Sequence, residues 1–323
     1  MKNALSNWEQ QSGLIWEDSK LTKGFRHAMV DIGNNISLSV EVAGNPNNPT
    51  LLLLLGLGSQ MVFWPNNFVN KLLDAGFFVV RFDNRDVGLS TKIKVPQLPK
   101  PNRVKMMLKM QFGVSNHAEP VPYNLVDMAD DAHRLIKRLN LKDINLLGAS
   151  MGGIISQILT AKHPEHIHRL MLLFSTTNRK FLRVPKTKQL MTFFNRPASF
   201  SEKDFIRHSV WFMNAVGSPG HVNIKRVRET AKIRYDRCFY PRGSLQQLQA
   251  ILATGSISKY SEQIKVPTIV MHGSEDGLVP TSHGRDIAKT IPDAKFHLIE
   301  GMGHDIPDYY QPFIVSLIIN HCF

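Results

Sequence analysis

The stretch that decides the fold of this 323-residue chain is INLLGASMGG, residues 144–153. Its first four residues predict a buried strand, and the residues that follow, IISQILTAKHP at 154–164, have the spacing of a helix. Between the two lies a G-x-S-x-G pattern, which is typical of a sharp strand-to-helix turn that presents a serine. Because backbone segments pack closely at such a turn, only small residues fit at Gly148 and Gly152. The pattern therefore predicts Ser150 as a nucleophile.

The position of Ser150 at a helix N-terminus also predicts how negative charge beside it is stabilised. Backbone N–H groups and the partial positive charge of the helix end face a developing oxyanion, and Met151 would supply one such N–H. The second donor is expected in the loop LLGLGSQMVFW, residues 54–64, which follows the strand expected at 50–55. We assign it to the backbone of Leu57, directly after Gly56.

A serine nucleophile needs a general base, and the base needs a carboxylate to orient it. Among thirteen histidines, His304 alone follows a strand pattern, AKFHLIE at 294–300, in a loop bracketed by glycines. The carboxylate is expected in HGSEDGLVP, residues 272–280, directly after the strand PTIVM. Asp276 is preferred there, with Glu275 as the rival one position away. The chain order of serine, aspartate and histidine is the order expected of α/β-hydrolases.

The rest of the chain alternates short strand patterns with helical segments. This alternation predicts an α/β fold with a mostly parallel sheet, in which the strand at 50–55 is the third and the first two form an antiparallel hairpin. An amphipathic helix is expected at 124–139. The strand patterns are NISLSVEVAG (35–44), TLLLLLGLG (50–58), FFVVRFD (77–83), INLLGAS (144–150), IHRLMLLFS (167–175), PTIVMHGS (267–274) and AKFHLIEGM (294–302).

The alternation of strand patterns and helical segments is absent between Asn178 and Glu262. This segment mixes Phe, Met and Trp with many cations, and prolines at 185, 197 and 219 break its helical pattern into pieces. We expect several helices and no sheet. The expected division is a core part at 1–177, a helical lid at 178–262 and a second core part at 263–323.

The net charge of +13 is concentrated in two segments. Residues 178–262 hold sixteen Lys and Arg against five acidic residues, and residues 91–118 hold six cations and no acid. Two interpretations stay open: a solvated lysine-rich surface, or attraction to anionic substrates or membrane lipid. Nucleic acid is not an expected partner, because no nucleic-acid-binding module accompanies the charge.

Composition favours a soluble enzyme, with 43% apolar and 20% charged residues. Apolar runs are too short to span a bilayer, and the first twenty residues lack the apolar core of a secretory signal. The two cysteines, Cys238 and Cys322, lie far apart without a CxxC pair, which favours a reducing compartment. A cytoplasmic protein is expected.

Several motifs of other chemistries are incomplete. Gly56 and Gly58 begin a dinucleotide pattern, but Met61 stands where its third glycine belongs, and residues 148–153 lack the Lys-Ser/Thr pair of a phosphate loop. No H-E-x-x-H motif or carboxylate cluster indicates a metal. We expect no cofactor and no metal. The charged segment RFDNRDVGLS (81–90) is interpreted as a hydrogen-bonded turn rather than as catalytic residues.

Together the motifs LGLGSQMVFWP, RFDNRDVGLST, LLGASMGG, MHGSEDGLVP and IEGMGHDIP resemble those of the α/β-hydrolase family, most of all small esterases of the aclacinomycin methylesterase type. The resemblance runs from about residue 25 to the C-terminus, apart from the lid. It implies an eight-stranded, mostly parallel sheet. It also implies that Ser150 is the nucleophile, Asp276 the acid and His304 the base, and that the oxyanion donors are the backbone N–H groups of Leu57 and Met151. Many relatives read His-Gly where this chain has Leu55-Gly56.

The function expected is hydrolysis of carboxylic esters through an acyl-serine intermediate, on a small-molecule ester that is hydrophobic or anionic. One alternative is amide or peptide cleavage of the proline iminopeptidase sort, which the cationic lid disfavours because a free amine needs carboxylates. Another is a non-catalytic ligand-binding protein on the same fold. Epoxide hydrolases and haloalkane dehalogenases are excluded, because they employ an aspartate where this chain has Ser150.

Overall fold

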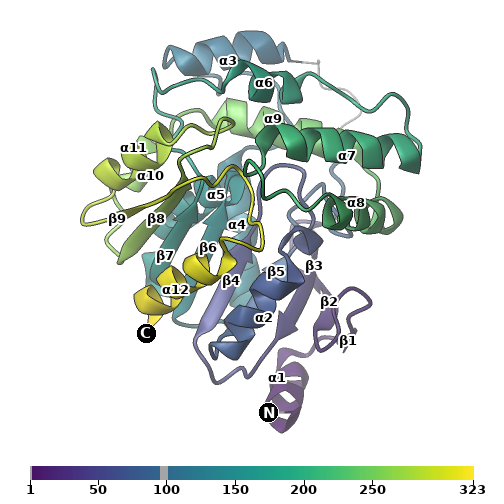
Figure 1. The fold of residues 1–323 in the computed structure, drawn as a ribbon. Coiled ribbons are helices and arrows are strands. Elements are labelled where there is room, and N and C mark those ends of the chain that lie inside the picture. The colour runs from purple at the N-terminus through teal and green to yellow at the C-terminus, as the bar shows by residue number, and fades with distance from the viewer. Residues whose placement is uncertain (1, 95–100) are drawn as a thin grey trace.

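The computed structural model describes residues 2–94 and 101–323 and shows one sheet with helices on both faces and a helical layer over one edge (Figure 1). The strand order is β1-β2-β3-β5-β4-β6-β7-β8-β9. The first three neighbouring pairs are antiparallel and the remaining five are parallel. The strands are β1 (Glu17–Asp18), β2 (Arg26–Asp31), β3 (Ser37–Ala43), β4 (Thr50–Leu54), β5 (Phe78–Phe82), β6 (Ile144–Ala149), β7 (Ile167–Leu173), β8 (Thr268–Gly273) and β9 (Lys295–Ile299).

The mostly parallel sheet and the antiparallel hairpin of β2 and β3 confirm the predicted fold class. The number of strands differs, because the sheet has nine where eight were expected. The additional strand is β1, a pair of exposed residues that adds to the edge of β2. Two residues are too few to produce an apolar alternation, so the sequence pattern carries no signal for this strand.

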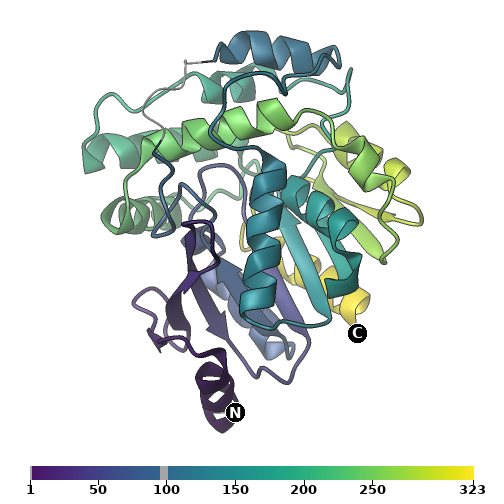
Figure 2. The same cartoon turned by 180° about the vertical axis from the view of Figure 1, so that it is seen from behind.

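Helices cover both faces of the sheet, and the leucines of β4 show why. Leu52 and Leu54 pack into the cluster beneath three helices, α4 (Leu125–Arg138), α5 (Met151–Lys162) and α11 (Ser282–Thr290). Leu51 and Leu53 pack into the opposite cluster, beneath α2 (Asn66–Asp74) and α12 (Gln311–Cys322). Side chains alternate between the faces of a strand, so an uninterrupted apolar run belongs in a strand that is covered on both sides. Figure 1 shows α2 and α12 on the near face, and Figure 2 shows α4 and α5 on the other.

The helix expected at 124–139 is α4 (Leu125–Arg138), with Asn124 as its N-cap. Asn124 accepts from the backbone N–H of Asp127, and the carboxylate of Asp127 accepts from the N–H of Asn124. This reciprocal capping box fixes the start of the helix. The other helices of the two faces are α1 (Lys2–Ser12), α2 (Asn66–Asp74), α5 (Met151–Lys162), α10 (Ser258–Ser261), α11 (Ser282–Thr290) and α12 (Gln311–Cys322), with short 3-10 turns at Met61–Phe63 (η1) and Pro164–His166 (η2).

The layer over the carboxyl ends of the parallel strands is helical (Figure 1). Among the described residues, the segment 178–262 contains helices and no strand. The helix α3 (Arg103–Gln111) lies outside that segment in sequence but belongs to this layer in space, because its Met106 packs against Leu248 and Leu252 of α9. The helices between 178 and 254 are α6 (Thr187–Leu190), η3 (Met191–Phe193), α7 (Glu202–Val216), α8 (Ile224–Arg237) and α9 (Pro241–Thr254). Within residues 2–94 and 101–323, no helix combines the length and apolar character needed to cross a bilayer.

Candidate active site

Ser150 occupies the turn between β6 and α5 in a strained backbone conformation. Its φ of 55° and ψ of −122° lie in a region that residues with a side chain rarely adopt. The turn packs so closely that a Cβ at Gly148 would lie 2.6 Å from the carbonyl oxygen of Gly152, and a Cβ at Gly152 would lie 2.3 Å from that of Leu54. Both glycines are therefore required by packing, as the G-x-S-x-G pattern predicts.

Ser150, His304 and Asp276 form one hydrogen-bonded line across three loops. The Oγ of Ser150 lies 3.0 Å from Nε2 of His304. On the other side of the ring, Nδ1 of His304 lies 2.7 Å from Oδ2 of Asp276. The three residues follow β6, β9 and β8, which are parallel strands whose carboxyl ends meet at one edge of the sheet. The structure thus brings together three side chains that are up to 154 positions apart.

The Asp276 carboxylate is buried, and the groups around it favour its charged form. Its Oδ1 accepts from the backbone N–H groups of Leu278 and Val279, at 2.9 and 2.8 Å. Burial acts to raise the pKa of Asp276, but the facing imidazoles of His304 and His272 outweigh burial and lower the pKa well below its usual range. Asp276 therefore stays ionised at neutral pH.

The rival carboxylate, Glu275, lies elsewhere. Its side chain is half-exposed, and it pairs with Lys186 at 3.9 Å. The structure therefore places Asp276, and not Glu275, beside His304. His272 was not among the predicted residues, although its Nε2 lies 3.4 Å from Asp276 Oδ2. His272 lies four residues before Asp276, near the end of β8, and this position in the sequence could have indicated that it faces the carboxylate.

The loop after β4 lies directly against Ser150. A Cβ at Gly56 would be 2.9 Å from the Cβ of Ser150, which leaves room for hydrogen only. Leu57 follows in this loop, and Met151 is the first residue of α5, where a helix leaves its N–H groups without intrahelical partners. Met151 therefore adjoins Ser150 in the chain, and Leu57 adjoins Gly56, which packs against Ser150. The loop itself is supported by Asn84, whose amide donates to the carbonyl of Leu55.

The charged segment 81–90 is a hydrogen-bonded structure, as interpreted from its sequence. Asp83 accepts from the backbone N–H groups of Met61 and Leu89, at 2.7 and 3.1 Å. It also accepts from Arg237, at the end of α8, in an ion pair whose two side chains are buried. Burial raises the pKa of Asp83, and the charge of Arg237 opposes that rise. This segment therefore fastens the helical layer to the loop that carries Leu57.

A second set of hydrogen bonds, which the sequence analysis did not predict, holds the loop that carries His304. The carboxylate of Asp305 accepts from the backbone N–H and the hydroxyl of Ser218, in the loop after α7. The same hydroxyl accepts from the N–H of Gly303, and the N–H of His304 donates to the carbonyl of Val216 at 2.8 Å. The helical layer thus fixes the backbone on both sides of the imidazole.

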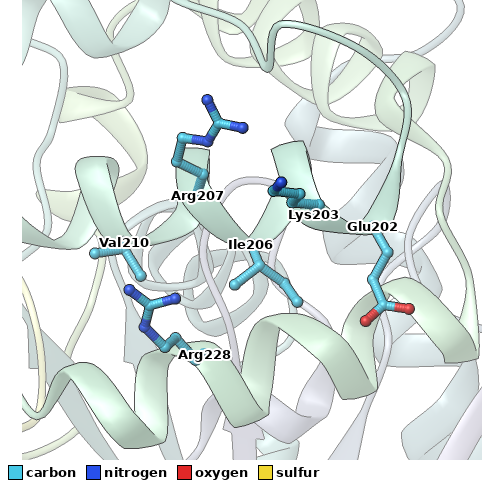
Figure 3. A pocket seen from close by; sticks show the side chains of 6 residues that line it. All are labelled: Glu202, Lys203, Ile206, Arg207, Val210 and Arg228. Carbon is cyan, nitrogen blue, oxygen red and sulfur yellow. The ribbon is translucent and has the colours of Figure 1, made fainter.

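An open hollow of about 600 Å³ lies between α7 and α8 (Figure 3). No side chain of the line at Ser150 contributes to its wall, so it is a separate feature of the outer layer. The residues that line it are Glu202, Lys203, Ile206, Arg207, Val210 and Arg228.

Comparison with known proteins gives one family and several distant relatives. The model of the family described as alpha/beta hydrolase fold matches residues 49–309. Rhodomycin D methylesterase from Streptomyces peucetius is 25% identical over 311 residues, covering 89% of this chain and 95% of the relative. A poly(3-hydroxyalkanoate) depolymerase from Ectopseudomonas oleovorans is 24% identical, covering 85% of this chain and 84% of the relative.

Solved structures share the fold at lower identity. The 2-hydroxy-6-oxo-6-phenylhexa-2,4-dienoate hydrolase of Rhodococcus sp. strain RHA1 superimposes with a TM-score of 0.69 at 16% identity, covering 95% of this chain and 99% of that one. The enol-lactonase from Burkholderia xenovorans gives a TM-score of 0.66 at 18% identity, covering 90% and 98%. At such identities these structures support the architecture alone.

Proposed function

This chain belongs to the α/β-hydrolase fold family, and on that premise we propose that it hydrolyses carboxylic esters with Ser150 as its nucleophile. The observation that carries the proposal is the continuous line from the Ser150 hydroxyl through His304 to Asp276, with distances of 3.0 and 2.7 Å. A serine is a weak nucleophile unless a positioned base accepts its proton, and this geometry supplies the base.

The reaction follows from the positions of these atoms. The Nε2 of His304 accepts the hydroxyl proton while Oγ of Ser150 bonds to the ester carbonyl carbon. The N–H groups of Leu57 and Met151 stabilise the resulting oxyanion. The imidazolium then gives its proton to the alcohol oxygen as the carbon–oxygen bond breaks, which leaves an acyl-serine. Water attacks the acyl group, its proton passes to His304, and the acid leaves as the proton returns to Ser150.

Asp276 has a different part in this sequence. Because its carboxylate accepts from Nδ1 of His304, that nitrogen keeps its proton and Nε2 keeps the lone pair that faces Ser150. The negative charge of Asp276 also stabilises the imidazolium that forms in both halves of the reaction. Asp276 can do this because its pKa lies below its usual range and the carboxylate remains charged.

Ester cleavage is favoured over amide or peptide cleavage by the relatives and by the charge of the lid. Two of the relatives are named for ester substrates, a methylesterase and a polyester depolymerase. Recognition of a free α-amine needs an available carboxylate, and three of the five lid carboxylates, those of Glu202, Asp204 and Asp236, already form ion pairs with lid cations. We expect p-nitrophenyl esters of increasing acyl length to be hydrolysed and aminoacyl p-nitroanilides to be resistant. Faster cleavage of the anilides would contradict the ester assignment.

We further propose that the lid approaches its hydrophobic or anionic ester substrate at an anionic lipid surface. Val104, Leu108 and Phe112 stand at four-residue steps along α3 and its C-cap, and each side chain is more than half exposed. They form an outward apolar stripe opposite the buried Met106. Figure 1 shows α3 and α6 together on the outer side of the lid.

Phe181 extends this stripe, and cations surround it. The rings of Phe112 and Phe181 lie edge to face at 6.1 Å, and Phe181 is also largely exposed. Residues 179–196 contain six Lys and Arg and no acidic residue. An exposed apolar stripe bordered by cations matches an interface of acyl chains and anionic headgroups. Binding to phosphatidylglycerol vesicles should weaken as salt increases, and salt-independent binding or none would contradict the proposal.

A further inference from the structure

Three histidines and a glutamate gather on the sheet face opposite α12, where α4 lies against the end of α5. His133 belongs to α4, His163 follows the last residue of α5, and Glu165 and His166 lie in η2. The ligand atoms of His133, His163 and Glu165 all lie within 4.8 Å of one another. Sequence patterns predict no metal here, because His133 is thirty or more positions from its partners and belongs to no recognised spacing.

The distances in this cluster approach those of a metal shell. Oε1 of Glu165 lies 3.7 Å from Nδ1 of His163 and 3.6 Å from Nε2 of His166. Ligands with bonds of about 2.1 Å to a tetrahedral ion stand about 3.4 Å apart. A carboxylate between two imidazoles at this spacing is placed to share one ion with an imidazole. From these contacts we propose that His133, His163 and Glu165 bind a divalent transition-metal ion such as Zn²⁺, with His166 beside the same carboxylate.

The imidazoles of His133 and His163 lie against each other in this cluster. The two rings stack at 3.5 Å with an angle of 12° between their planes. Because a metal lies in the plane of an imidazole that binds it, one ring turns out of the stack on binding. Both rings are partly exposed, as such a rotation requires.

The position of the cluster also favours a cation. His163 is the C-cap of α5, where a helix ends in carbonyl groups and partial negative charge. The neighbouring lysine, Lys162, is already bonded to Asp130. Ser150 lies at the opposite end of the same helix, roughly 18 Å away for twelve residues at 1.5 Å each. The metal therefore cross-links α4 to the end of α5 and takes no part in ester hydrolysis.

Titration calorimetry with Zn²⁺ on the full-length protein at pH 7.5 tests the proposal. We expect one ion per chain, and we expect His163→Ala and Glu165→Gln each to weaken binding at least about tenfold. Glu165 is largely exposed, so its variant tests the site without disturbing the core. His117→Ala, which removes an exposed histidine from a distant loop, is the matched control and should bind as the unaltered protein does.

Two further measurements separate specific coordination from surface adsorption. Co²⁺ should give the intense visible absorption of a tetrahedral site in the unaltered protein and not in His163→Ala. Zn²⁺ should also raise the melting temperature of the unaltered protein and of Ser150→Ala equally, whatever the outcome of the esterase assays. Absence of stoichiometric binding, or equal affinity in His163→Ala and the unaltered protein, would overturn the proposal.

Discussion

The strand-end loops and the helical lid differ in how their functional residues are held. Ser150, Asp276 and His304 follow three parallel strands, and buried backbone contacts fix the turns that carry them. The lid is attached through side chains, among them the buried pair of Arg237 and Asp83 and the contact of Ser218 with Asp305. The sheet therefore places the three side chains, whereas the lid holds the loops that carry His304 and Leu57.

Removing the proposed nucleophile should have the largest effect. Ser150→Ala deletes the hydroxyl that lies 3.0 Å from Nε2 of His304, so we expect kcat for p-nitrophenyl esters to fall by about 10⁶-fold. Its melting temperature should change little, because the strained turn is imposed by the surrounding backbone. Steady-state kinetics and a thermal melt of the same sample check both statements. Activity within tenfold of the unaltered enzyme would place the nucleophile elsewhere.

Replacing Asp276 by Asn should have the next largest effect, because His304 then loses the acceptor that fixes its tautomer. We expect kcat to fall by about 10⁴-fold with a small change in KM. Glu275→Gln is a matched control one position away and should leave kcat within a few-fold, because Glu275 lies apart from the imidazole. Steady-state kinetics of the two variants measure the contrast, and similar losses in both would show that Asp276 does not orient His304.

The Asp276→Asn variant also has a pH-dependent stability, whose sign follows from the lowered pKa of Asp276. A carboxyl with a lowered folded pKa stabilises the protein above its unfolded pKa of about 3.9. That stabilisation is lost as pH falls through the folded pKa. The difference in unfolding free energy between the unaltered protein and Asp276→Asn should therefore be constant from about pH 5 to 7 and shrink below about pH 4. Urea unfolding at several pH values measures it, and a difference that grows in acid would contradict the assignment.

Breaking the lid attachment should act on stability more than on chemistry. Arg237→Ala leaves the Asp83 carboxylate buried without its cation, which should cost about 3 kcal/mol of unfolding free energy. Arg207→Ala is the matched control, because Arg207 is an exposed lid arginine whose ion pair with Asp204 lies at the surface. Its melting temperature should stay unchanged. Equal losses in the two variants would show that Arg237 does not fasten the lid.

The exposed stripe of the lid should give the smallest effect. Phe112→Ser and Phe181→Ser together should weaken binding to phosphatidylglycerol vesicles by about tenfold and leave hydrolysis of a short water-soluble ester unchanged. Phe313→Ser, an exposed phenylalanine of α12, is the control on a different helix. Vesicle sedimentation measures the difference, and an equal loss for Phe313→Ser would mean that the lid surface is not the contact.

Most of the site could be predicted because each residue lies in a short local pattern. The glycines around Ser150 and the strands before Asp276 and His304 produce signals within about ten residues. Other contacts join residues that are far apart in the chain, and no sequence spacing reveals them. The hydrogen bonds between Ser218 and Asp305 span 87 positions, and the ion pair of Arg237 with Asp83 spans 154. The place of α3 in the lid was missed for the same reason, because its packing against α9 depends on the folded chain.

Labelling with a fluorophosphonate, followed by peptide mass spectrometry, tests the central claim most directly, because the probe reacts with a serine only when a base activates it. We predict one adduct per chain, located on Ser150, and a labelling rate that falls at least about 10³-fold in His304→Ala. An adduct on another residue, or a rate that is the same in His304→Ala, would contradict the hydrogen-bonded line on which the proposed activity depends.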